Sequence, residues 1–307
     1  MDRRLLGKLR CVDCGGLEVL LEAEGPANLD QVVTGTVICD DCGRVMRITD
    51  RIIQCSPATD DQRDIWEGLY EAQNESLRGV IESLENGFAN PDALRAYYPI
   101  LRIIGDLPDH VGSSVELGCG SGAFSLILKK MGLVDEVTLL DYSMPSLKTA
   151  ERLFEHFDER CNLVHAKLET HPFREGAFDV SLSGGVIEHF RSRDERLGCL
   201  EVHLGPAKLA YIQAPVSAPM YWFQRFAVTV LKRGWPLGFE KPLTVKELKL
   251  LLRLAGADIL RMDYHYFLSV LALRKPSLMK WRWFARRIWF TRPLRTEIAV
   301  LVSRKPR

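Results

Sequence analysis

A glycine-rich turn between an apolar strand and a helix constrains this chain more than any other feature. Residues 115–122 read Val-Glu-Leu-Gly-Cys-Gly-Ser-Gly, and the pattern continues as a helix from Phe124 to Lys130. Glycines at alternate positions let a ligand lie directly against the backbone, because no Cβ excludes it. Two acidic residues accompany the turn, Glu116 inside the strand and Asp141 after the next strand. We therefore expect a cofactor site at this turn.

From residue 113 onward the chain alternates strand-like and helical segments. The strand-like runs cover 114–117, 137–140, 162–166, 178–183, 208–213, 258–262 and 298–302. Such alternation predicts an α/β fold with a doubly wound, mainly parallel, seven-stranded sheet covered by helices on both faces. In that architecture a ligand binds beyond the carboxyl ends of the strands, which is where the glycine turn lies.

Four of the eight cysteines form two C-x-x-C pairs near the N-terminus, Cys11 with Cys14 and Cys39 with Cys42. Each pair is followed by a glycine, and the residues between the pairs favour β-structure. Four thiolates at paired hairpin tips are the ligands of a closed tetrahedral zinc site. Because four cysteines leave no coordination position open, we expect a structural Zn²⁺ in a small ribbon over residues 1–57.

The glycine turn alone also matches a dinucleotide-binding pattern. Gly118, Gly120 and Ala123 satisfy G-x-G-x-x-A, so a nicotinamide enzyme is a competing interpretation. Two observations oppose it. Gly122 adds a third glycine, and Glu116 places a carboxylate next to the turn, which suits a positively charged ligand group better than a pyrophosphate.

Residues 113–215 resemble class I S-adenosylmethionine-dependent methyltransferases. The stretch 115–123 is similar to their first motif, 139–143 to the second, 178–190 to the fourth strand and its exit loop, and 244–256 to a late helix. The resemblance implies a Rossmann-like methyltransferase domain over 113–307. It follows the N-terminal zinc ribbon (1–57) and a linker with a helical lead-in (58–112).

The resemblance also implies which residues bind the cofactor. Backbone at Gly118–Gly122 would approach the methionine part, Glu116 would favour its ammonium group, and Asp141 would accept two hydrogen bonds from the ribose hydroxyls. Tyr142 would cover the adenine. The backbone amide of Leu168 would recognise the adenine, because Lys167 stands where the family often carries an acidic residue. The implied set is Glu116, Gly118, Cys119, Gly120, Gly122, Asp141, Tyr142, Leu168 and Gly184.

Methyl transfer depends mainly on positioning, and a general base is needed only if the acceptor must lose a proton. His189 follows the fourth predicted strand at the mouth of the expected site and is the first candidate for this base. His265, between two tyrosines, is the second candidate. A packing or helix-starting role is the open alternative for His189.

Two stretches rich in aromatic and basic residues bear on the methyl acceptor. The first is an expected insertion near 216–243, and the second is an expected helix near 277–290 in which Trp283 and Phe290 lie among arginines. Aromatic residues beside arginines suit a lipid headgroup layer, and they also suit nucleic acid. A third interpretation of the segment near 277–290 is a basic helix face exposed to solvent, with its aromatic residues there by chance.

The expected activity is therefore methyl transfer from S-adenosylmethionine to a small-molecule or lipid-linked acceptor. The ribbon resembles small zinc-ribbon proteins that activate methyltransferases of RNA and translation factors. An RNA- or translation-factor-directed methyltransferase, or a nucleic-acid-binding zinc protein, is accordingly the alternative. The net charge of only +1 disfavours RNA. Met1 to Arg10 lacks the apolar core of a secretory signal, and no apolar run is long enough to span a bilayer. We expect a cytoplasmic protein, with peripheral membrane contact through 277–290 as a further expectation.

Overall fold

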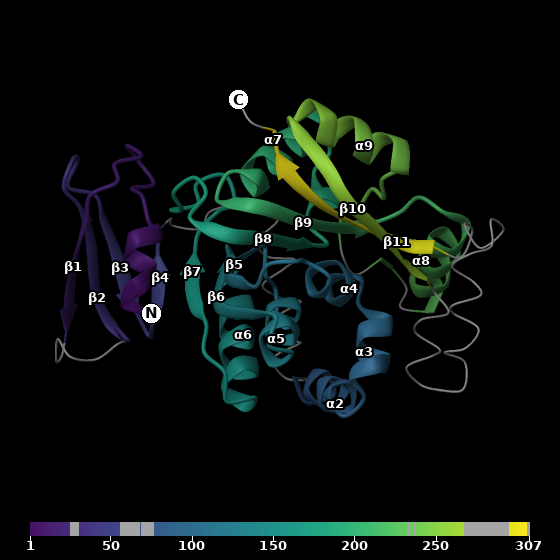
Figure 1. Cartoon of the computed structure of the whole chain (residues 1–307), viewed down its shortest axis with the longest axis horizontal. Coiled ribbons are helices and arrows are strands. Elements are labelled where there is room, and N and C mark those ends of the chain that lie inside the picture. The colour runs from purple at the N-terminus through teal and green to yellow at the C-terminus, as the bar shows by residue number, and fades with distance from the viewer. Residues whose placement is uncertain are drawn as a thin grey trace. The chain divides into compact units, whose positions relative to one another are not determined.

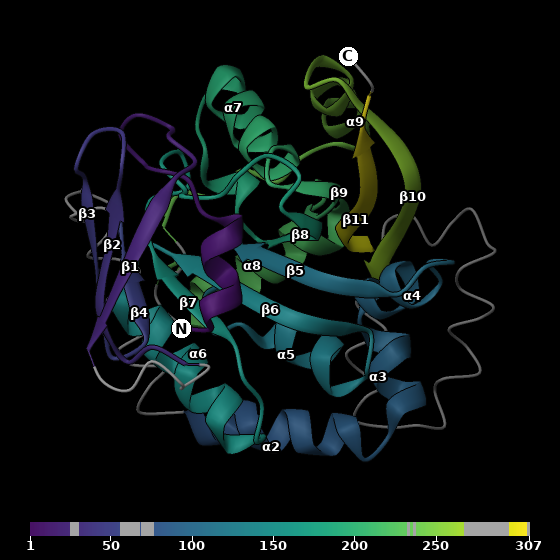
Figure 2. The ribbon, with the colours of Figure 1, turned by 60° about the vertical axis from the view of Figure 1, so that its left-hand side comes forward.

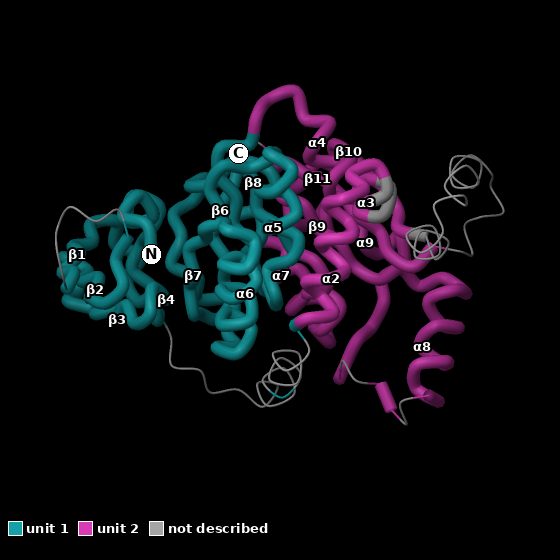
Figure 3. Tube along the Cα trace, turned by 90° about the horizontal axis from the view of Figure 1, so that it is seen from below, with its two compact units in different colours: residues 1–77, 111–183, 202–209 teal, residues 78–110, 184–201, 210–307 magenta. Residues whose placement is uncertain are grey.

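A computed structural model describes residues 1–24, 31–55, 68, 77–231, 234–235, 238–266 and 295–305. The chain divides into two compact units, coloured separately in Figure 3. The first unit comprises Met1–Leu77, Val111–Ser183 and Val202–Leu209. The second comprises Arg78–His110, Gly184–Glu201 and Ala210–Arg307. The expected basic helix near 277–290 lies outside the described residues.

The N-terminal ribbon of the first unit is a short helix followed by four strands (Figure 1). Its elements are η1 (Arg3–Lys8), β1 (Val19–Glu24), β2 (Thr34–Cys39), β3 (Val45–Thr49) and β4 (Ile52–Gln54). Strands β1 to β4 pair antiparallel in chain order. The alternating burial of β2, with Val37 and Cys39 inside, follows from the alternation of side chains along a strand.

A parallel sheet forms the rest of the first unit, with strands joined by helices as the alternating sequence predicts. Its elements are β5 (Val111–Leu117), α5 (Ala123–Lys130), β6 (Val134–Asp141), α6 (Met144–His156), β7 (Asn162–His165), β8 (Phe178–Gly184) and the start of β9 (Ala207–Pro215). Strand β5 pairs with both β6 and β8, and β6 pairs with β7, all in parallel. The carboxyl ends of β5 and β6 therefore lie side by side.

The ribbon is part of the same sheet because β4 pairs in parallel with β7. Ile52 is opposite Leu163, Ile53 opposite Val164, and Gln54 opposite His165. The strand order in this unit is β1-β2-β3-β4-β7-β6-β5-β8. The described strands thus number eleven: the seven predicted from residue 113 onward and four from the ribbon. The two Ile side chains of β4 are both buried, which an edge strand with one solvated face would not require.

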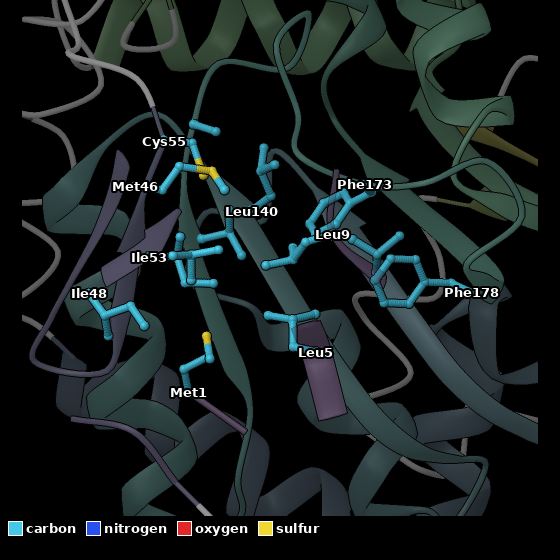
Figure 4. Packing of buried hydrophobic residues seen from close by; sticks show 14 of the residues in the cluster. Met1, Leu5, Leu9, Met46, Ile48, Ile53, Cys55, Leu140, Phe173 and Phe178 are labelled. Carbon is cyan, nitrogen blue, oxygen red and sulfur yellow. The ribbon is translucent and has the colours of Figure 1, made fainter. Parts of the chain in front are cut away.

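The two faces of the parallel sheet are covered by different parts of the chain (Figure 2). On one face, Glu116 of β5 contacts Ser125 of α5. On the other, Val115 and Leu117 join a buried cluster with Leu5 of η1. Figure 4 shows this cluster, in which ribbon and sheet side chains interdigitate. Its buried members are Met1, Leu5, Leu9, Val32, Val37, Met46, Ile48, Ile53, Cys55, Val115, Leu117, Leu140, Val164, Ala166, Phe173, Phe178 and Ala207.

The second unit holds the remaining helices and the end of the sheet. Its elements are α2 (Leu77–Phe88), α3 (Pro91–Tyr97), α4 (Pro99–Gly105), η2 (Ile187–His189), α7 (Arg193–Leu204), the rest of β9, α8 (Pro219–Leu231), α9 (Val245–Leu254), β10 (Ala257–Tyr266) and β11 (Arg295–Arg304). Strand β11 lies between β9 and β10 and runs antiparallel to β10. Helix α8 occupies the expected insertion near 216–243.

The fold class predicted from the sequence is confirmed: an α/β, doubly wound and mainly parallel sheet with an N-terminal cysteine ribbon. The domain boundary near residue 57 stays a prediction, because most of the residues from 56 to 76 lie outside the described part of the chain.

Candidate functional site

The glycine turn follows β5 directly and begins helix α5. Gly118, Gly120 and Gly122 all have positive φ values, of 71°, 53° and 68°. Side chains with a Cβ adopt this left-handed region only with strain, so the alternating glycines are a requirement of the turn itself. The amides of Gly118 and Cys119 donate to the Leu140 carbonyl at 2.9 and 3.0 Å, which fixes the turn to the end of β6.

Asp141 ends β6 and contacts the turn with its carboxylate. Oδ2 accepts a hydrogen bond from the Gly120 amide at 2.9 Å, and Oδ1 accepts one from the Ser143 amide at 2.9 Å. The side chain is buried, and this burial raises its pKa to about 6 although the amide donors oppose the shift. A carboxylate so held at the carboxyl edge of a parallel sheet can accept further hydrogen bonds from ligand hydroxyls.

Glu116 lies beneath the turn, in contact with the first residues of α5. Its Oε2 accepts hydrogen bonds from the Ser125 hydroxyl at 2.6 Å and from the Ser125 amide at 3.2 Å. Burial raises the pKa of Glu116 to about 7, with the nearby Asp141 adding to the effect. A carboxylate near the amino end of a helix is favoured by the helix dipole. Glu116 therefore places a titratable carboxyl group below the turn and holds the start of α5.

Gly122 has a packing role that the sequence interpretation missed. A Cβ at this position would lie 2.7 Å from Leu139 Cδ1 and 3.4 Å from atoms of Ala150 and Phe154. The third glycine therefore allows α5 to start close to β6 and α6, and this packing role is independent of any contact with a ligand. The sequence could have indicated this packing role, because Gly122 is the N-cap residue of α5 and the start of that helix lies close to the strand before it.

The other predicted cofactor residues of the first unit lie near this edge or in the core. Cys119 is buried, and desolvation raises its pKa well above the usual range, so the thiol is neutral. Tyr142 follows Asp141, is half-buried, and its carbonyl is 2.9 Å from Nε2 of His165. Leu168 packs against the buried cluster of Figure 4. His165 had no predicted role, although a polar residue ending the apolar run of β7 marks such an edge position.

Gly184 and His189 belong to the second unit. Gly184 is the last residue of β8, and His189 ends η2. Nδ1 of His189 is 2.8 Å from the Phe239 carbonyl, and burial lowers the pKa of the ring. The second candidate, His265, is buried on β10 with Nδ1 3.0 Å from the Thr296 hydroxyl. A lowered pKa keeps His189 neutral near pH 7, which a proton acceptor needs.

The four cysteines of the ribbon come together as their spacing predicts. Their Sγ atoms all lie within 4.8 Å of one another, and Cys11–Cys42 and Cys14–Cys39 are 3.6 Å apart. Zinc–sulfur bonds of about 2.3 Å in a tetrahedron place the sulfurs about 3.8 Å apart, so the cluster has the right size. Gly15 and Gly43 have φ values of 76° and 72° in the turns after each pair. The cluster is thus compatible with a zinc ribbon.

Comparison with known proteins identifies the family of the central part of the chain. Residues 115–204 match the family model of a methyltransferase domain. No curated protein matches the chain in sequence.

Several solved structures are similar to this chain, and the one with a TM-score above 0.5 shares its fold. A chain from the Haloferax volcanii complex of the Trm112 methyltransferase activator has 16% identity over 81% of this chain and 100% of that chain, with a TM-score of 0.51. The cyclopropane synthase MmaA2 of Mycobacterium tuberculosis has 16% identity, 67% and 82% coverage and a TM-score of 0.48. A SAM-dependent methyltransferase of Methanosarcina mazei has 16% identity, 68% and 99% coverage and a TM-score of 0.48.

The motif-bearing turn, the sheet topology and the family match agree with one another. Residues 115–204 belong to an S-adenosylmethionine-dependent methyltransferase domain, and a four-cysteine cluster compatible with a zinc ribbon precedes it.

Proposed function

We propose that S-adenosylmethionine binds at the carboxyl ends of β5 and β6. The observation that carries this proposal is the buried carboxylate of Asp141, held 2.9 Å from the Gly120 amide at the edge of the sheet. Asp141 would accept the ribose hydroxyls, and the backbone from Gly118 through Cys119 and Gly120 to Gly122 would lie along the methionine part. Glu116 would favour the ammonium group of that part through its charge.

Three further residues complete the proposed cofactor set. Tyr142 would cover the adenine, the Leu168 amide would hydrogen-bond it, and Gly184 would leave space at the end of β8. When bound, the cofactor supplies a methyl group already activated by the sulfonium. This chain's residues therefore have to bind the cofactor and the acceptor and orient them toward each other. His189 would accept the proton from an acceptor that has one to lose, with its lowered pKa keeping the ring neutral.

Equilibrium dialysis with labelled S-adenosylmethionine tests the pocket. Wild type should bind, and Asp141→Ala should bind much more weakly because the ribose hydroxyls lose their acceptor. Asp109→Ala is the matched control, because Asp109 is exposed and lies in the second unit. Equal binding by wild type and Asp141→Ala would reject this pocket.

We further propose that the four cysteines hold a structural Zn²⁺ and that the ribbon braces the methyltransferase sheet. The parallel pairing of β4 with β7 and the shared buried cluster support this role. The Trm112 activator in the Haloferax volcanii complex is a separate chain. A ribbon fused to the sheet would provide bracing within one chain.

The proposed methyl acceptor is a small or lipid-linked molecule. None of the described helices is long and apolar enough to cross a membrane. Helix α8, however, exposes a row of large apolar side chains: Trp222 is 49% exposed, Phe223 62%, Phe226 69% and Leu231 83%. Between Glu201 and Glu240 the sequence has no acidic residue, and Lys232 and Arg233 follow α8. Apolar and aromatic residues flanked by basic ones suit the surface of an anionic bilayer.

Co-sedimentation with lipid vesicles tests this surface. Wild type should sediment with phosphatidylglycerol vesicles more than with phosphatidylcholine vesicles. The double variant Phe223→Ser/Phe226→Ser should lose most of the binding. Leu250→Ser on α9 is the control, because Leu250 is a comparably exposed apolar residue, 45% exposed. Absence of vesicle binding together with salt-sensitive RNA binding would favour the RNA-directed alternative instead.

A further inference from the structure

Three carboxylates of the second unit interact with one another and lack matching positive charge among the residues that the structure describes. Glu188 is in η2, Glu240 follows α8, and Glu297 is on β11. Glu188 and Glu240 are 3% and 7% exposed, and Glu297 is half-buried. The amide of Lys241, next to Glu240, donates to the Glu188 carbonyl at 3.0 Å, and the three carboxylates interact electrostatically with one another. They form what we call the carboxylate cluster.

Donors from the protein satisfy two members of the carboxylate cluster. Glu240 accepts hydrogen bonds from the Tyr221 hydroxyl at 2.8 Å and from Nε1 of Trp235 at 3.1 Å. Glu297 accepts one from Nε2 of Gln213 at 2.5 Å. Glu188 differs, because its buried Oε2 has no hydrogen-bond donor among the described residues. A buried oxygen that lacks a donor is costly and rare in native proteins.

The two described arginines nearest the cluster are directed elsewhere, whereas Nδ1 of His265 lies 3.9 Å from Glu297 Oε2. Arg225 donates to the Glu240 carbonyl at 2.7 Å and to the Tyr221 hydroxyl at 3.0 Å, not to a carboxylate. Arg196 pairs with Glu247 at 2.9 Å, and its other donors reach backbone carbonyls. Burial, with added repulsion from Glu240 and Glu297, raises the pKa of Glu188 well above its usual range, and Arg196 only partly opposes this. Among the described residues, the cluster therefore has too little positive charge to pair its three carboxylates.

Gly185 lies beside the Glu188 carboxyl group. This residue is exposed, has a φ of 79°, and a Cβ there would lie 3.4 Å from Glu188 Oε1. Glycine at this position adds no side chain next to the Glu188 carboxyl group. Among the described residues, only the four cysteines are close enough together to hold a metal ion, so the cluster is too spread for a cation with short bonds.

We propose that Glu188, together with Glu240 and Glu297, binds an ammonium group of the methyl acceptor. An ammonium has three divergent N–H donors and one positive charge, which would supply a donor to Glu188 Oε2 and offset the repulsion within the cluster. This inference rests on the proposed function for its assignment to the acceptor. It adds the chemical class: a small or lipid-linked molecule that carries a protonated amine.

Ligand-observed NMR titration of the full-length protein tests the inference with ethanolamine and ethylene glycol as probes. The two differ by an ammonium in place of a hydroxyl. Wild type should bind ethanolamine at least tenfold more tightly than ethylene glycol. Glu188→Gln should reduce ethanolamine binding at least tenfold, because the amide removes the charge and keeps the size. Glu201→Gln, an exposed position on α7, should bind ethanolamine as wild type does.

Binding of labelled S-adenosylmethionine, measured on the same samples, separates the two proposals. If Glu188→Gln retains cofactor binding and ethanolamine binding is unchanged, the ammonium site is wrong while the cofactor pocket stands. If wild type binds ethanolamine but no cofactor, the proposed function is wrong while the ammonium site stands. If Glu188→Gln fails to fold, Glu297→Gln replaces it, and unchanged ethanolamine binding by that variant would overturn the inference. Equal binding of the two probes by wild type would also overturn it.

Discussion

Two buried carboxylates beneath the glycine turn behave differently from ordinary surface acids. Burial raises the pKa of Asp141 to about 6 and that of Glu116 to about 7. Because these values exceed those of the unfolded chain, the folded protein binds more protons. The contribution of both groups to stability is therefore fully present below about pH 4 and declines as pH rises through 6 and 7. Cofactor binding should show the opposite trend.

We predict that affinity for S-adenosylmethionine falls as the pH drops below about 6. A protonated Asp141 keeps fewer acceptor sites for the ribose hydroxyls than the carboxylate does. Asp141→Asn should bind the cofactor roughly 100-fold more weakly, about 3 kcal/mol, as expected for two lost hydrogen bonds to a charged group. Equilibrium dialysis from pH 5 to 8 measures both effects. A variant with wild-type affinity and an unchanged pH profile would contradict the role of Asp141.

We predict that Gly122→Ala destabilises the protein more than Gly132→Ala. Both glycines have similar positive φ values, 68° and 65°, so the backbone strain is shared, about 1–2 kcal/mol. Only at Gly122 does the new Cβ meet another atom, Leu139 Cδ1 at 2.7 Å, whereas nothing lies within 4 Å at Gly132. The clash should add about 1–3 kcal/mol. Urea unfolding of both variants measures the difference, and equal destabilisation would show that the packing around Gly122 relaxes freely.

At the residue level, the sequence predicted which residues form the turn and the cysteine cluster better than it predicted their contacts. It located the turn, Asp141 and the four cysteines, because glycine spacing and C-x-x-C pairs are local patterns. The hydrogen bonds of Glu116 to Ser125 depend on how α5 packs, nine positions further along the chain. The grouping of Glu188 with Glu240 and Glu297 depends on segments far apart in the sequence, and no local pattern indicates it.

At the scale of elements, the main departure is the place of the ribbon. The strands of the methyltransferase sheet follow from the alternation of apolar runs. All of them extend beyond the predicted bounds except β7, which ends one residue earlier than predicted. By contrast, β4 has three residues, and its apolar pair Ile52-Ile53 is too short to indicate a partner. The spacing of Met1, Leu5 and Leu9 places three apolar residues on one side of the N-terminal segment. That this side packs on a face of the sheet depends on tertiary structure, which the local spacing does not predict.

We predict that Leu9→Ala destabilises the first unit by about 2–5 kcal/mol, because Leu9 is fully buried in the cluster shared by ribbon and sheet. Leu20→Ala on β1 is the control, since Leu20 is 58% exposed, and it should cost less than about 0.5 kcal/mol. Chemical denaturation followed by cofactor-site probes and by far-UV circular dichroism measures both. Unfolding of the ribbon alone in Leu9→Ala, with the sheet unaffected, would contradict the shared core.

At the scale of the whole molecule, the cysteine cluster and the glycine turn belong to one compact unit. Hydrogen bonds between neighbouring strands link the end of the ribbon to the residues beside the turn. The Cys55 amide, next to β4, donates to the His165 carbonyl at 3.0 Å, and the His165 ring is 2.9 Å from the Tyr142 carbonyl beside Asp141. A change in the ribbon can therefore reach the proposed cofactor pocket through neighbouring strands.

We predict that removal of zinc lowers both stability and cofactor affinity. Structural zinc contributes about 10–16 kcal/mol in small zinc modules, which is comparable to the whole stability of a domain. Chelation should lower the unfolding midpoint and weaken binding of labelled S-adenosylmethionine, and added zinc should restore both. Cys14→Ser should mimic chelation, whereas Cys161→Ser, outside the cluster, should not. Unchanged cofactor affinity in the zinc-free protein would show that ribbon and pocket are independent.

The pairing of β4 with β7 also affects how copies of this protein behave toward one another. An uncovered strand edge exposes a row of unpaired amides and carbonyls, onto which a strand of another molecule can add. In this unit the strand beside β7 is supplied by the chain itself, and the outermost strand becomes β1, where Glu22 and Glu24 are exposed. Negative charges on an edge strand discourage such addition. A chain without its first 55 residues would leave the apolar strand β7 open, and we expect it to aggregate rather than remain an inactive monomer.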